Sequence, residues 1–320
     1  MADFSGSSGF LIMGKQNYFF TDFRYREIAE KLAKNGARLQ FQFIELDKRT
    51  PEILKKIIGS SKTIAFESEH MTVEELSRWK KRLKGVKFTP LMDTIEELRK
   101  YKDDEEIAKL KKSQQINEDT LARVKKLLKP GITELEVAWK IKIIGHDSGA
   151  EDISFEPIVA FQENSSTPHH QNTNRKLRKN ELVLIDMGMK YKEYCSDMTR
   201  TFFFGKGAKE QLAIYDLVLN AQMAGIKAIR HGVKASTPDT AARKIMGKYE
   251  KFFGHSLGHG IGLDVHESPS LSSNSKDVLK ENMIVTVEPG IYLKGKFGVR
   301  IEDMGRVTKT GYENFTKAPK

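Results

Sequence analysis

Two aspartates in one apolar stretch are the first residues of this sequence that could carry chemistry. In Glu181–Thr201, an apolar run leads into Asp186, and a polar tip separates it from Asp197. β-Branched and aromatic residues around a polar tip are typical of a β-hairpin. A turn centred on Tyr191 and Lys192 would place the two aspartates directly opposite each other, with Cβ atoms about 5 Å apart. Two buried carboxylates so close repel each other, which a bridging metal ion would relieve. The alternative is a pair of solvent-facing aspartates near a turn.

A second pair of acidic residues repeats this arrangement near the end of the chain. The run VTVEPGIY presents Glu288 after an apolar stretch, and the run GVRIED presents Glu302. A loop centred on Gly295, in the lysine-rich tip between them, would place the two glutamates opposite each other. The sequence therefore predicts two strand pairs that each offer two acids.

Histidines that could complete a metal site lie in two segments. The run GHSLGHGIGLDVHE holds His255, His259 and His266 among four glycines, and TPHH, after a strand-like PIVAF, holds His169 and His170. A helical phase would put His255 and His259 on one face, but the glycines favour an extended backbone that other segments approach closely. Their spacing matches neither a phosphate loop nor a dinucleotide-binding turn, so no nucleotide site is predicted here.

One histidine and the four acids make a ligand set of Asp, Asp, His, Glu and Glu. Oxygen ligands with one imidazole suit divalent ions such as Mn²⁺, Co²⁺ or Zn²⁺. Four carboxylates carry too much negative charge for one buried ion, and two ions about 3.5–4 Å apart would balance that charge better. Taken singly, each acid could be a surface residue and each histidine a hydrogen-bonded core residue. The joint pattern is what favours a metal site.

The elements that must position these residues divide the chain into two parts. Residues 1–90 alternate strand-like and helix-like segments, which is typical of a small α/β unit. Residues 92–129 are charged and helical and resemble a connector that leads into a long helix. We therefore predict two domains, residues 1–100 and residues 101–320.

Helix signals in both parts are specific enough to test. Thr72 with Glu75, and Thr133 with Glu136, have the spacing of capping boxes at helix starts. In the second part, helices mix with antiparallel strand pairs, which favours an α+β domain over a parallel βαβ sheet. Further amphipathic helices are predicted over residues 208–231 and 238–253.

The composition describes a soluble globular protein with a basic surface. The 320 residues carry a net charge of +11, and 39% of them are hydrophobic. Lysines are mixed with acids and no aromatic-interleaved basic stretch occurs, so no specific nucleic-acid site is predicted. There is no run of 18 apolar residues and no signal-peptide pattern, so we expect a cytoplasmic protein without a membrane span. Cys195, the only cysteine, is expected to be a small core thiol.

These motifs resemble those of a known family. The blocks SFEPIVA, TPHH, DMGMKYKEYCSDMTRTFFFG, HSLGHGIGLDVHE, VEPGIY and GVRIED are similar to those of the pita-bread metallopeptidases, which comprise Xaa-Pro aminopeptidases, Xaa-Pro dipeptidases (prolidases) and methionine aminopeptidases. The run NYFFTDFRYREIAEKL resembles the creatinase-like domain of the Xaa-Pro enzymes, which methionine aminopeptidases lack. The resemblance implies an α+β pita-bread catalytic domain, with an antiparallel sheet flanked by helices. A small α/β creatinase-like N-terminal domain, shortened in this chain, would precede it.

The resemblance also implies a residue-by-residue site. The metal ligands it implies are Asp186, Asp197, His259, Glu288 and Glu302, with Asp197 and Glu302 as the bridging carboxylates. It implies two divalent ions, with Mn²⁺ as the first choice and Co²⁺ or Zn²⁺ as alternatives. The catalytic and supporting residues it implies are Glu288, His169, His266, His255 and Arg300.

The activity that the resemblance implies is hydrolysis of the bond between an N-terminal residue and a following proline. Water shared by the two ions would attack the carbonyl carbon before the proline. Glu288 would take the water's proton and pass it to the leaving nitrogen. His266 and His169 would stabilise the oxyanion or hold the proline side. Proline-containing peptides are the expected substrates, and a homodimer is the expected assembly.

This chain departs from the resemblance at two places. Relatives usually carry a further strand and helix before the first domain, which puts the dimer contact and part of the substrate rim in question. The loop AFQENSSTPHH also replaces a version made of small residues. Phe161, Gln162 and Glu163 are therefore expected to reshape one wall of the pocket.

Three other functions compete with an Xaa-Pro aminopeptidase. A prolidase would need a group that caps the free carboxylate of a dipeptide, and the sequence does not reveal one clearly. A non-catalytic homologue would keep the fold as a binding surface. A metal-free activity like that of creatine hydrolases is the third. The last two are disfavoured because all five implied ligands are present.

Overall fold

The computed structural model describes residue 4 and residues 6–35 and 39–320, and the chain forms two compact units. The first unit is Met1–Thr94 and the second is Ile95–Lys320. The domain limits predicted from the sequence, 1–100 and 101–320, remain a prediction.

The first unit is an α/β arrangement. Its strands are β1 (Phe10–Ile12), β2 (Tyr18–Thr21), β3 (Gln42–Glu45), β4 (Thr63–Glu67) and β5 (Lys87–Leu91). Its helices are α1 (Arg26–Asn35), α2 (Thr50–Ile58) and α3 (Val73–Arg82), with 3₁₀ turns η1 (Phe23–Tyr25) and η2 (Gly59–Ser61). β2 pairs with β1 in antiparallel and with β3 in parallel, and β4 runs parallel to β5. Helices connect the parallel pairs, as such pairs require, and Phe20, Leu54 and Leu83 are buried between the helices and strands.

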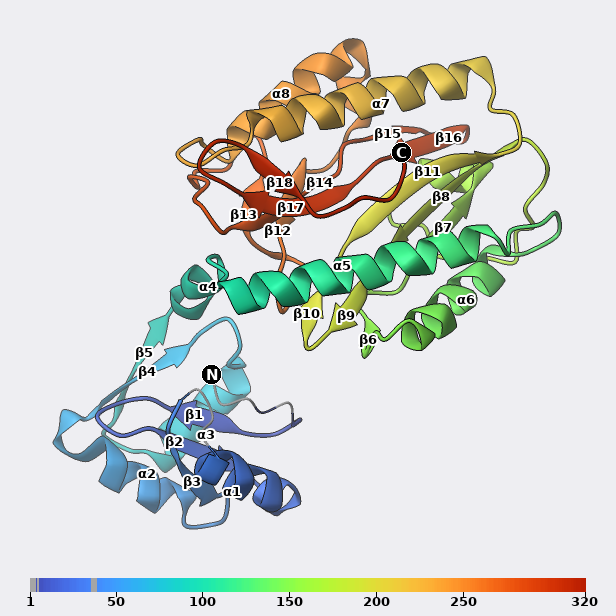
Figure 1. Ribbon diagram of the computed structural model, residues 1–320. Helices are drawn as coiled ribbons and strands as arrows, with labels where there is room; N and C mark the ends of the chain where they lie inside the picture. The colour runs from blue at the N-terminus through green and yellow to red at the C-terminus, as the bar shows by residue number, and fades with distance from the viewer. Residues whose placement is uncertain (1–3, 5, 36–38) are drawn as a thin grey trace. The chain divides into compact units, whose positions relative to one another are not determined.

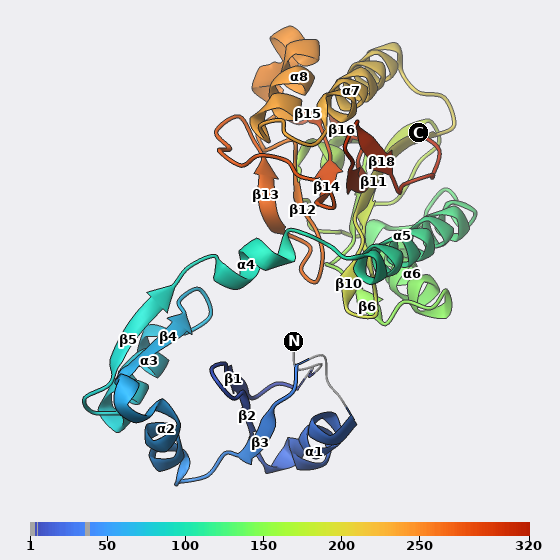
Figure 2. The same ribbon diagram turned by 60° about the vertical axis from the view of Figure 1, so that its left-hand side comes forward.

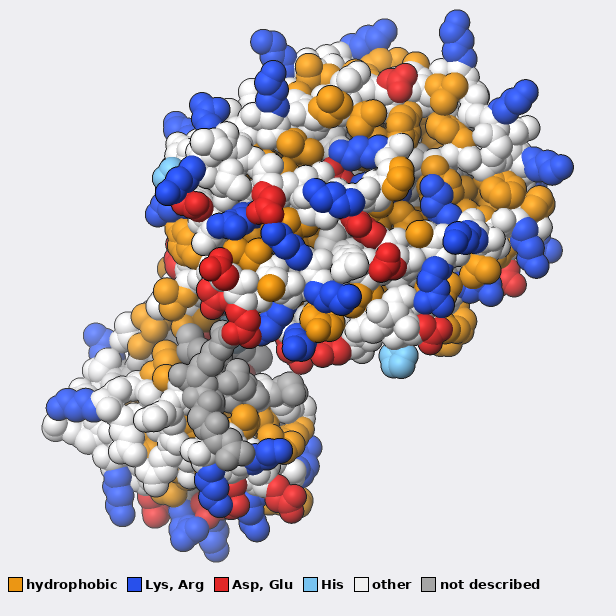
Figure 3. All heavy atoms as spheres, viewed as in Figure 1, with side chains coloured by type: hydrophobic (Ala, Val, Ile, Leu, Met, Phe, Trp, Pro, Cys, Tyr) orange, Lys and Arg blue, Asp and Glu red, His pale blue; other side chains and the backbone are white. Residues whose placement is uncertain are grey.

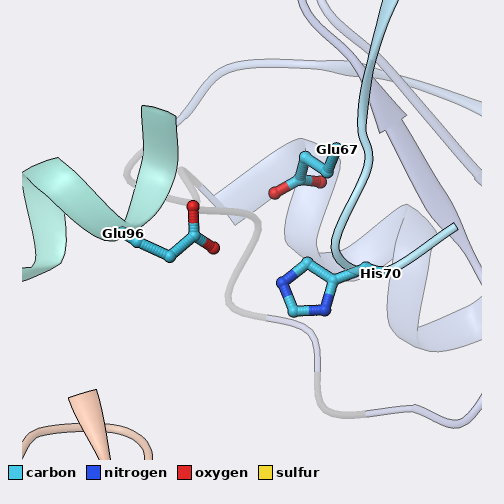
Figure 4. A group of neighbouring side chains, drawn as sticks. All are labelled: Glu67, His70 and Glu96. Atoms are coloured by element: carbon cyan, nitrogen blue, oxygen red, sulfur yellow. The ribbon is translucent and has the colours of Figure 1, made fainter. Parts of the chain in front are cut away.

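Local hydrogen bonds set the ends of elements in the first unit. The Glu75 amide donates to the Thr72 hydroxyl at 3.2 Å and the Glu75 carboxylate accepts from the Thr72 amide at 2.9 Å, which confirms the predicted capping box of α3. β4 ends at Glu67, and His70 follows in the next turn; Figure 4 draws both side chains. In this turn the His70 amide donates to the Glu67 carbonyl at 3.3 Å.

The second unit places antiparallel strands between two layers of helices (Figures 1 and 2). Its helices are α4 (Thr94–Arg99), α5 (Asp104–Lys125), α6 (Glu134–Asp147), α7 (Lys209–Ala228) and α8 (Ser236–Met246), with 3₁₀ turns η3 (Gln162–Ser166) and η4 (Gly247–Phe252). Its first strands are β6 (Asp152–Ile153), β7 (Ile158–Phe161), β8 (Glu181–Met187), β9 (Met189–Tyr191), β10 (Tyr194–Cys195) and β11 (Met198–Phe204). Its later strands are β12 (Gly258–Gly260), β13 (Glu267–Leu271), β14 (Ile284–Val287), β15 (Gly290–Leu293), β16 (Phe297–Arg300), β17 (Asp303–Val307) and β18 (Tyr312–Asn314).

Every strand pairing in the second unit is antiparallel. The sheets have the orders β11-β8-β7, β13-β12-β14-β17-β18, β10-β9-β6 and β15-β16. One buried cluster, which includes Val218 and Val285, packs α7 and α8 against β14 to β16. Another, which includes Ile141 and Ile185, packs α5 and α6 against β7, β8 and β11. The predicted α+β class, with antiparallel strands flanked by helices, is confirmed.

The predicted helices are present, with different ends. The capping box of Thr133 and Glu136 begins α6. The helix predicted over 238–253 instead starts at Ser236 and stops at Met246, because Gly247 has φ 52° and the chain continues as a 3₁₀ turn.

The surface carries its charges in a mixed pattern. On the face drawn in Figure 3, Lys and Arg side chains are scattered among Asp and Glu rather than gathered into one stripe. Among the helices that the structure describes, none is long and apolar enough to cross a membrane.

Candidate metal centre

The first hairpin brings its two aspartates to one face with a register that differs from the predicted one. Asp186 on β8 pairs with Thr199 on β11, so the prediction that it lies directly opposite Asp197 is wrong. The tip of the hairpin is Lys192–Glu193, and both residues have positive φ, as a type I′ turn requires. Asp197 comes two residues before Thr199, and side chains alternate along a strand, so Asp197 still shares the face of Asp186.

The second acidic pair has the predicted register. The register of β15 with β16 continues in that of β14 with β17, and Gly295, with φ 72°, lies at the tip. Glu288 and Glu302 therefore stand opposite each other in the gap between the two pairings. The Glu302 amide donates to the Thr199 carbonyl at 3.1 Å, which joins this strand pair to the first hairpin.

His259 on β12 points its Nε2 atom at the acids. Nε2 lies 3.3 Å from Glu288 Oε1 and 3.7 Å from Asp197 Oδ2. Its Nδ1 donates to the Gly260 carbonyl at 3.0 Å, a contact that leaves Nε2 as the atom available for a metal ion. β12 can lie this close to β14 because residue 258 is glycine: a Cβ there would be 2.0 Å from the Thr286 carbonyl oxygen.

The cluster buries more negative charge than its protein partners balance. Ligand atoms of Asp197, His259 and Glu302 all lie within 4.8 Å of one another. Asp186 Oδ1, Asp197 Oδ1 and Glu302 Oε1 are buried and accept no hydrogen bond. Burial, followed by repulsion from the neighbouring carboxylates, raises the pKa of Asp197 and Glu302 well above the usual range.

A divalent cation pair fits this donor set. Cations would give the three buried oxygens the partners that they lack, and oxygen ligands with one imidazole suit Mn²⁺, Co²⁺ or Zn²⁺. The ligand roles of Asp186, Asp197, His259, Glu288 and Glu302 remain a prediction, and the structure gathers all five in one place.

Arg300 holds the cluster from its buried side. Its guanidinium donates to Asp186 Oδ2 at 2.6 Å and to the Thr199 hydroxyl at 3.0 Å. The Thr199 hydroxyl in turn donates to Glu302 Oε2 at 2.8 Å. Arg300 thus orients one acid directly and another through Thr199. Thr199 carries no metal-ligand signature in the sequence, although its position two residues after Asp197 is a signal for the same face.

Tyr292 links Arg300 to His255. Its hydroxyl accepts from Arg300 at 2.8 Å and lies 2.9 Å from His255 Nε2. Since His255 Nδ1 donates to the Ser256 carbonyl, the Tyr292 hydroxyl donates to Nε2. Burial raises the pKa of Tyr292 to about 12, so the phenol keeps its proton for this contact. Sequence reasoning missed Tyr292, because a phenol in VEPGIY has no metal-ligand signature.

The other two predicted histidines are exposed beside the cluster. The His266 ring packs edge-on against His259, with ring centroids 4.4 Å apart. His169 follows Pro168, whose carbonyl accepts from Arg300 at 3.3 Å, so its loop reaches the site. Both exposed imidazoles are therefore free to meet a substrate, whereas His170 is paired with Glu134 at 2.9 Å.

The loop before His169 differs from the prediction at Phe161. Phe161 is fully buried in the core between β7 and α6, so it does not form a pocket wall. Gln162 has φ 46°, and its side-chain oxygen accepts from the Leu182 amide at 3.2 Å and from Gln211 at 3.0 Å. Glu163 forms an ion pair with Arg175 at 2.8 Å. These contacts fix the loop, and a part for Gln162 and Glu163 in the pocket wall stays a prediction.

Comparison with known proteins matches both units. The family model described as metallopeptidase family M24 matches residues 108–309, and the model described as creatinase/prolidase N-terminal domain matches residues 1–101. The chain is 36% identical to the uncharacterized peptidase YqhT of Bacillus subtilis over 327 residues, which cover 100% of this chain and 91% of that protein.

Solved structures of Xaa-Pro peptidases are similar over nearly the whole chain. The Xaa-Pro dipeptidase from Bacillus anthracis superposes with a TM-score of 0.94 at 36% identity, covering 100% of this chain and 90% of that one. The X-Pro aminopeptidase from Thermotoga maritima gives a TM-score of 0.89 at 34% identity, covering 98% and 89%.

Proposed function

The chain belongs to metallopeptidase family M24, and from that premise we propose that it is an aminopeptidase that releases the N-terminal residue from peptides with proline in second position. The buried, unpartnered oxygens of Asp186, Asp197 and Glu302 carry the proposal, since they provide for the dinuclear metal site of this family. The similarity to an X-Pro aminopeptidase and to an Xaa-Pro dipeptidase supports proline in the second position.

Five side chains would hold the ions in this proposal: Asp186, Asp197, His259, Glu288 and Glu302. When bound, a pair of divalent ions lowers the pKa of water towards neutrality and polarises the carbonyl that is attacked. Mn²⁺ is our first choice, with Co²⁺ or Zn²⁺ as alternatives. Arg300 and Thr199 keep the carboxylates of Asp186 and Glu302 in orientation through the hydrogen bonds described above.

Glu288 is the proposed general base. Burial raises the pKa of its carboxyl, but the hydrogen bond and the charge of His259 lower it by more, so the net pKa is lowered. Glu288 is therefore ionised at neutral pH and able to accept the proton of the attacking water. The same carboxyl would then deliver that proton to the proline nitrogen as it leaves.

His266 and His169 are the proposed substrate contacts. Their exposed imidazoles beside the cluster can donate to the oxyanion that develops on the attacked carbonyl, or hold the proline side. Because the scissile bond is a tertiary amide without an N–H, the site must recognise the pyrrolidine ring by shape. By resemblance we also expect a homodimer, which sedimentation would test.

The second candidate function is a prolidase, which cleaves only Xaa-Pro dipeptides. The Bacillus anthracis Xaa-Pro dipeptidase, with its TM-score of 0.94, favours it. The two activities differ on the product side of the site. A dipeptidase must bind the free carboxylate that follows proline, whereas an aminopeptidase must leave that side open.

Hydrolysis of two substrates tests the proposal. Protein reconstituted with Mn²⁺ is given the tripeptide Arg-Pro-Pro and the dipeptide Ala-Pro, with an Asp197→Asn variant as the control for contaminating peptidases. Release of arginine from the tripeptide is the expected result. Cleavage of the dipeptide alone would establish a prolidase, and cleavage of neither, with two ions bound, would contradict both candidates.

A further inference from the structure

A cluster of four charged residues involves the loop that carries His266. Two are cations, Arg99 at the end of α4 and Lys102 between α4 and α5. Two are acids, Asp264 in the loop between β12 and β13 and Glu267 at the start of β13 (elements labelled in Figure 1). Lys102 Nζ lies 2.9 Å from Glu267 Oε2. Arg99 donates to Glu267 and, at 2.8 Å, to Asp264. The cluster is balanced, with two charges of each sign.

Its central ion pair is deeply buried. The side chains of Lys102 and Glu267 are 2% and 7% exposed. Breaking such a pair by removing one partner leaves an uncompensated charge in a poorly solvated place. The segment that carries Lys102 and the loop that carries Glu267 are therefore held to each other firmly.

Glu267 also closes its own loop. Its carboxylate accepts from the Asp264 amide at 3.1 Å, and the Asp264 carbonyl accepts from the Gly262 amide at 3.1 Å. The carboxylate packs onto residue 262 so closely that a Cβ there would be 2.6 Å from Oε2. A loop with glycine at this position has little intrinsic stiffness, so its shape depends on its contacts. Glu267 and its two cations supply one set of contacts. Cys195 supplies the other, since its amide donates to the Gly262 carbonyl at 2.8 Å and its thiol to the Leu263 carbonyl at 3.4 Å.

The residue that this loop presents is His266, which immediately precedes Glu267. Among the described residues, its exposed ring makes one ring–ring contact, with His259, at 4.4 Å between ring centroids. The direction of the imidazole therefore depends on the backbone of the loop, and Glu267, next to His266 in the chain, is one of the groups that hold this backbone.

We propose that Lys102 and Arg99 are positioning residues for the reaction: through the carboxylate of Glu267 they fix the loop that aims His266 at the substrate. The proposal rests on the proposed function, in which His266 contacts the substrate. Neither cation touches the substrate or the metal cluster. Removing one of them should lower turnover through misplacement of His266 while the metal ligands stay in place.

Lys100 offers a matched control in the same segment. Its side chain is 8% exposed, and its ammonium pairs with Glu97 at 2.5 Å and Asp277 at 3.1 Å. Lys100→Met thus removes a similarly buried lysine two positions away, from an ion pair that does not involve the His266 loop.

A double-mutant cycle between Lys102 and His266 tests the proposal. We expect Lys102→Met to lower kcat/KM for an Xaa-Pro peptide about 10-fold, since a misplacement of about 1 Å can cost up to 100-fold. In a His266→Ala background the same substitution should change kcat/KM by less than about 2-fold, because the two changes act through one group. Metal content should stay at the wild-type level, Lys102→Arg should restore most of the activity, and Lys100→Met should retain it.

Glu267→Gln keeps the cycle usable if Lys102→Met does not fold, because glutamine keeps the size of the side chain and removes only its charge. Its smaller loss of kcat/KM should also vanish in the His266→Ala background. Equal losses in both backgrounds would overturn the positioning role, and so would a His266→Ala variant with normal activity. A wild-type protein that cleaves no Xaa-Pro substrate would overturn the proposed function as well, which separates the two failures.

Discussion

The second unit buries carboxylates in two different ways. Glu134, fully buried at the start of α6, accepts hydrogen bonds from the Phe161 amide, Asn164, His170 and both the amide and the hydroxyl of Thr173, at 2.7–3.0 Å. Asp197 and Glu302 are almost as deeply buried, yet each has one oxygen without any partner.

This difference in hydrogen-bond partners distinguishes acids with a structural role from acids that would bind a cation. A buried carboxylate is costly unless donors or cations compensate it. Around Glu134 the chain supplies the donors itself, so the acid organises the loop that leads to His169. Around Asp197 and Glu302 the chain instead supplies more acids, which only cations from outside can balance.

The largest expected effect comes from removing one of the uncompensated acids. Asp197→Asn should lower turnover about 10³-fold, several kcal/mol of transition-state stabilisation, because a bridging ligand is lost. The unfolding free energy of the metal-free protein should stay the same or rise, since one repelling charge is gone. Steady-state kinetics and metal analysis measure the two effects. Near-normal activity with full metal content would refute the ligand role of Asp197.

Replacing an acid by its amide at Glu134 should have the opposite result: it should lower the stability of the fold and leave metal binding unchanged. Glu134→Gln places an amide NH₂ among groups that all donate, so buried donors lose their acceptor. The unfolding free energy should fall by about 3 kcal/mol, measured by urea denaturation of the metal-free protein. Metal stoichiometry should remain that of the wild type. A loss of metal without a loss of stability would mean that Glu134 belongs to the site after all.

Removing the metal ions tests the role of the uncompensated acids without any mutation. Ions at 100 times their dissociation constant stabilise the folded state by about 2.7 kcal/mol, which corresponds to about 5–10 °C in thermal midpoint for a unit of this size. Chelation should therefore lower the midpoint of the wild type by about this amount, and that of Asp197→Asn by much less. Identical wild-type midpoints with and without Mn²⁺ would contradict a cation-balanced cluster.

Sequence reasoning succeeded where the signal is local. The capping boxes of Thr72 and Thr133 depend on residues three positions apart, and both are present. Gly295 marked the tip of its hairpin, because glycine adopts positive φ without strain, and the register of Glu288 with Glu302 followed from it.

It failed where the signal depends on tertiary structure. The tip of the first hairpin has positive φ at Lys192 and Glu193, which lack the Asn-Gly signature of a type I′ turn, so the register was misplaced. Glu134 looks like an ordinary acid in the first turn of a helix. Its role appears only when a loop 27–39 residues further along the chain folds over it.

The smallest effect concerns Gln162, the first residue of η3. Its φ of 46° is strained for any residue with a Cβ, and its side chain accepts from Leu182 and Gln211. Gln162→Ala and Gln162→Gly both remove that acceptor, but only alanine keeps the strain. The glycine variant should therefore be more stable than the alanine variant by about 1 kcal/mol, measured by urea denaturation. If alanine proves equal to glycine, the backbone at 162 relaxes once the amide is gone. The loop before His169 would then owe its conformation to Gln162 rather than to Glu134.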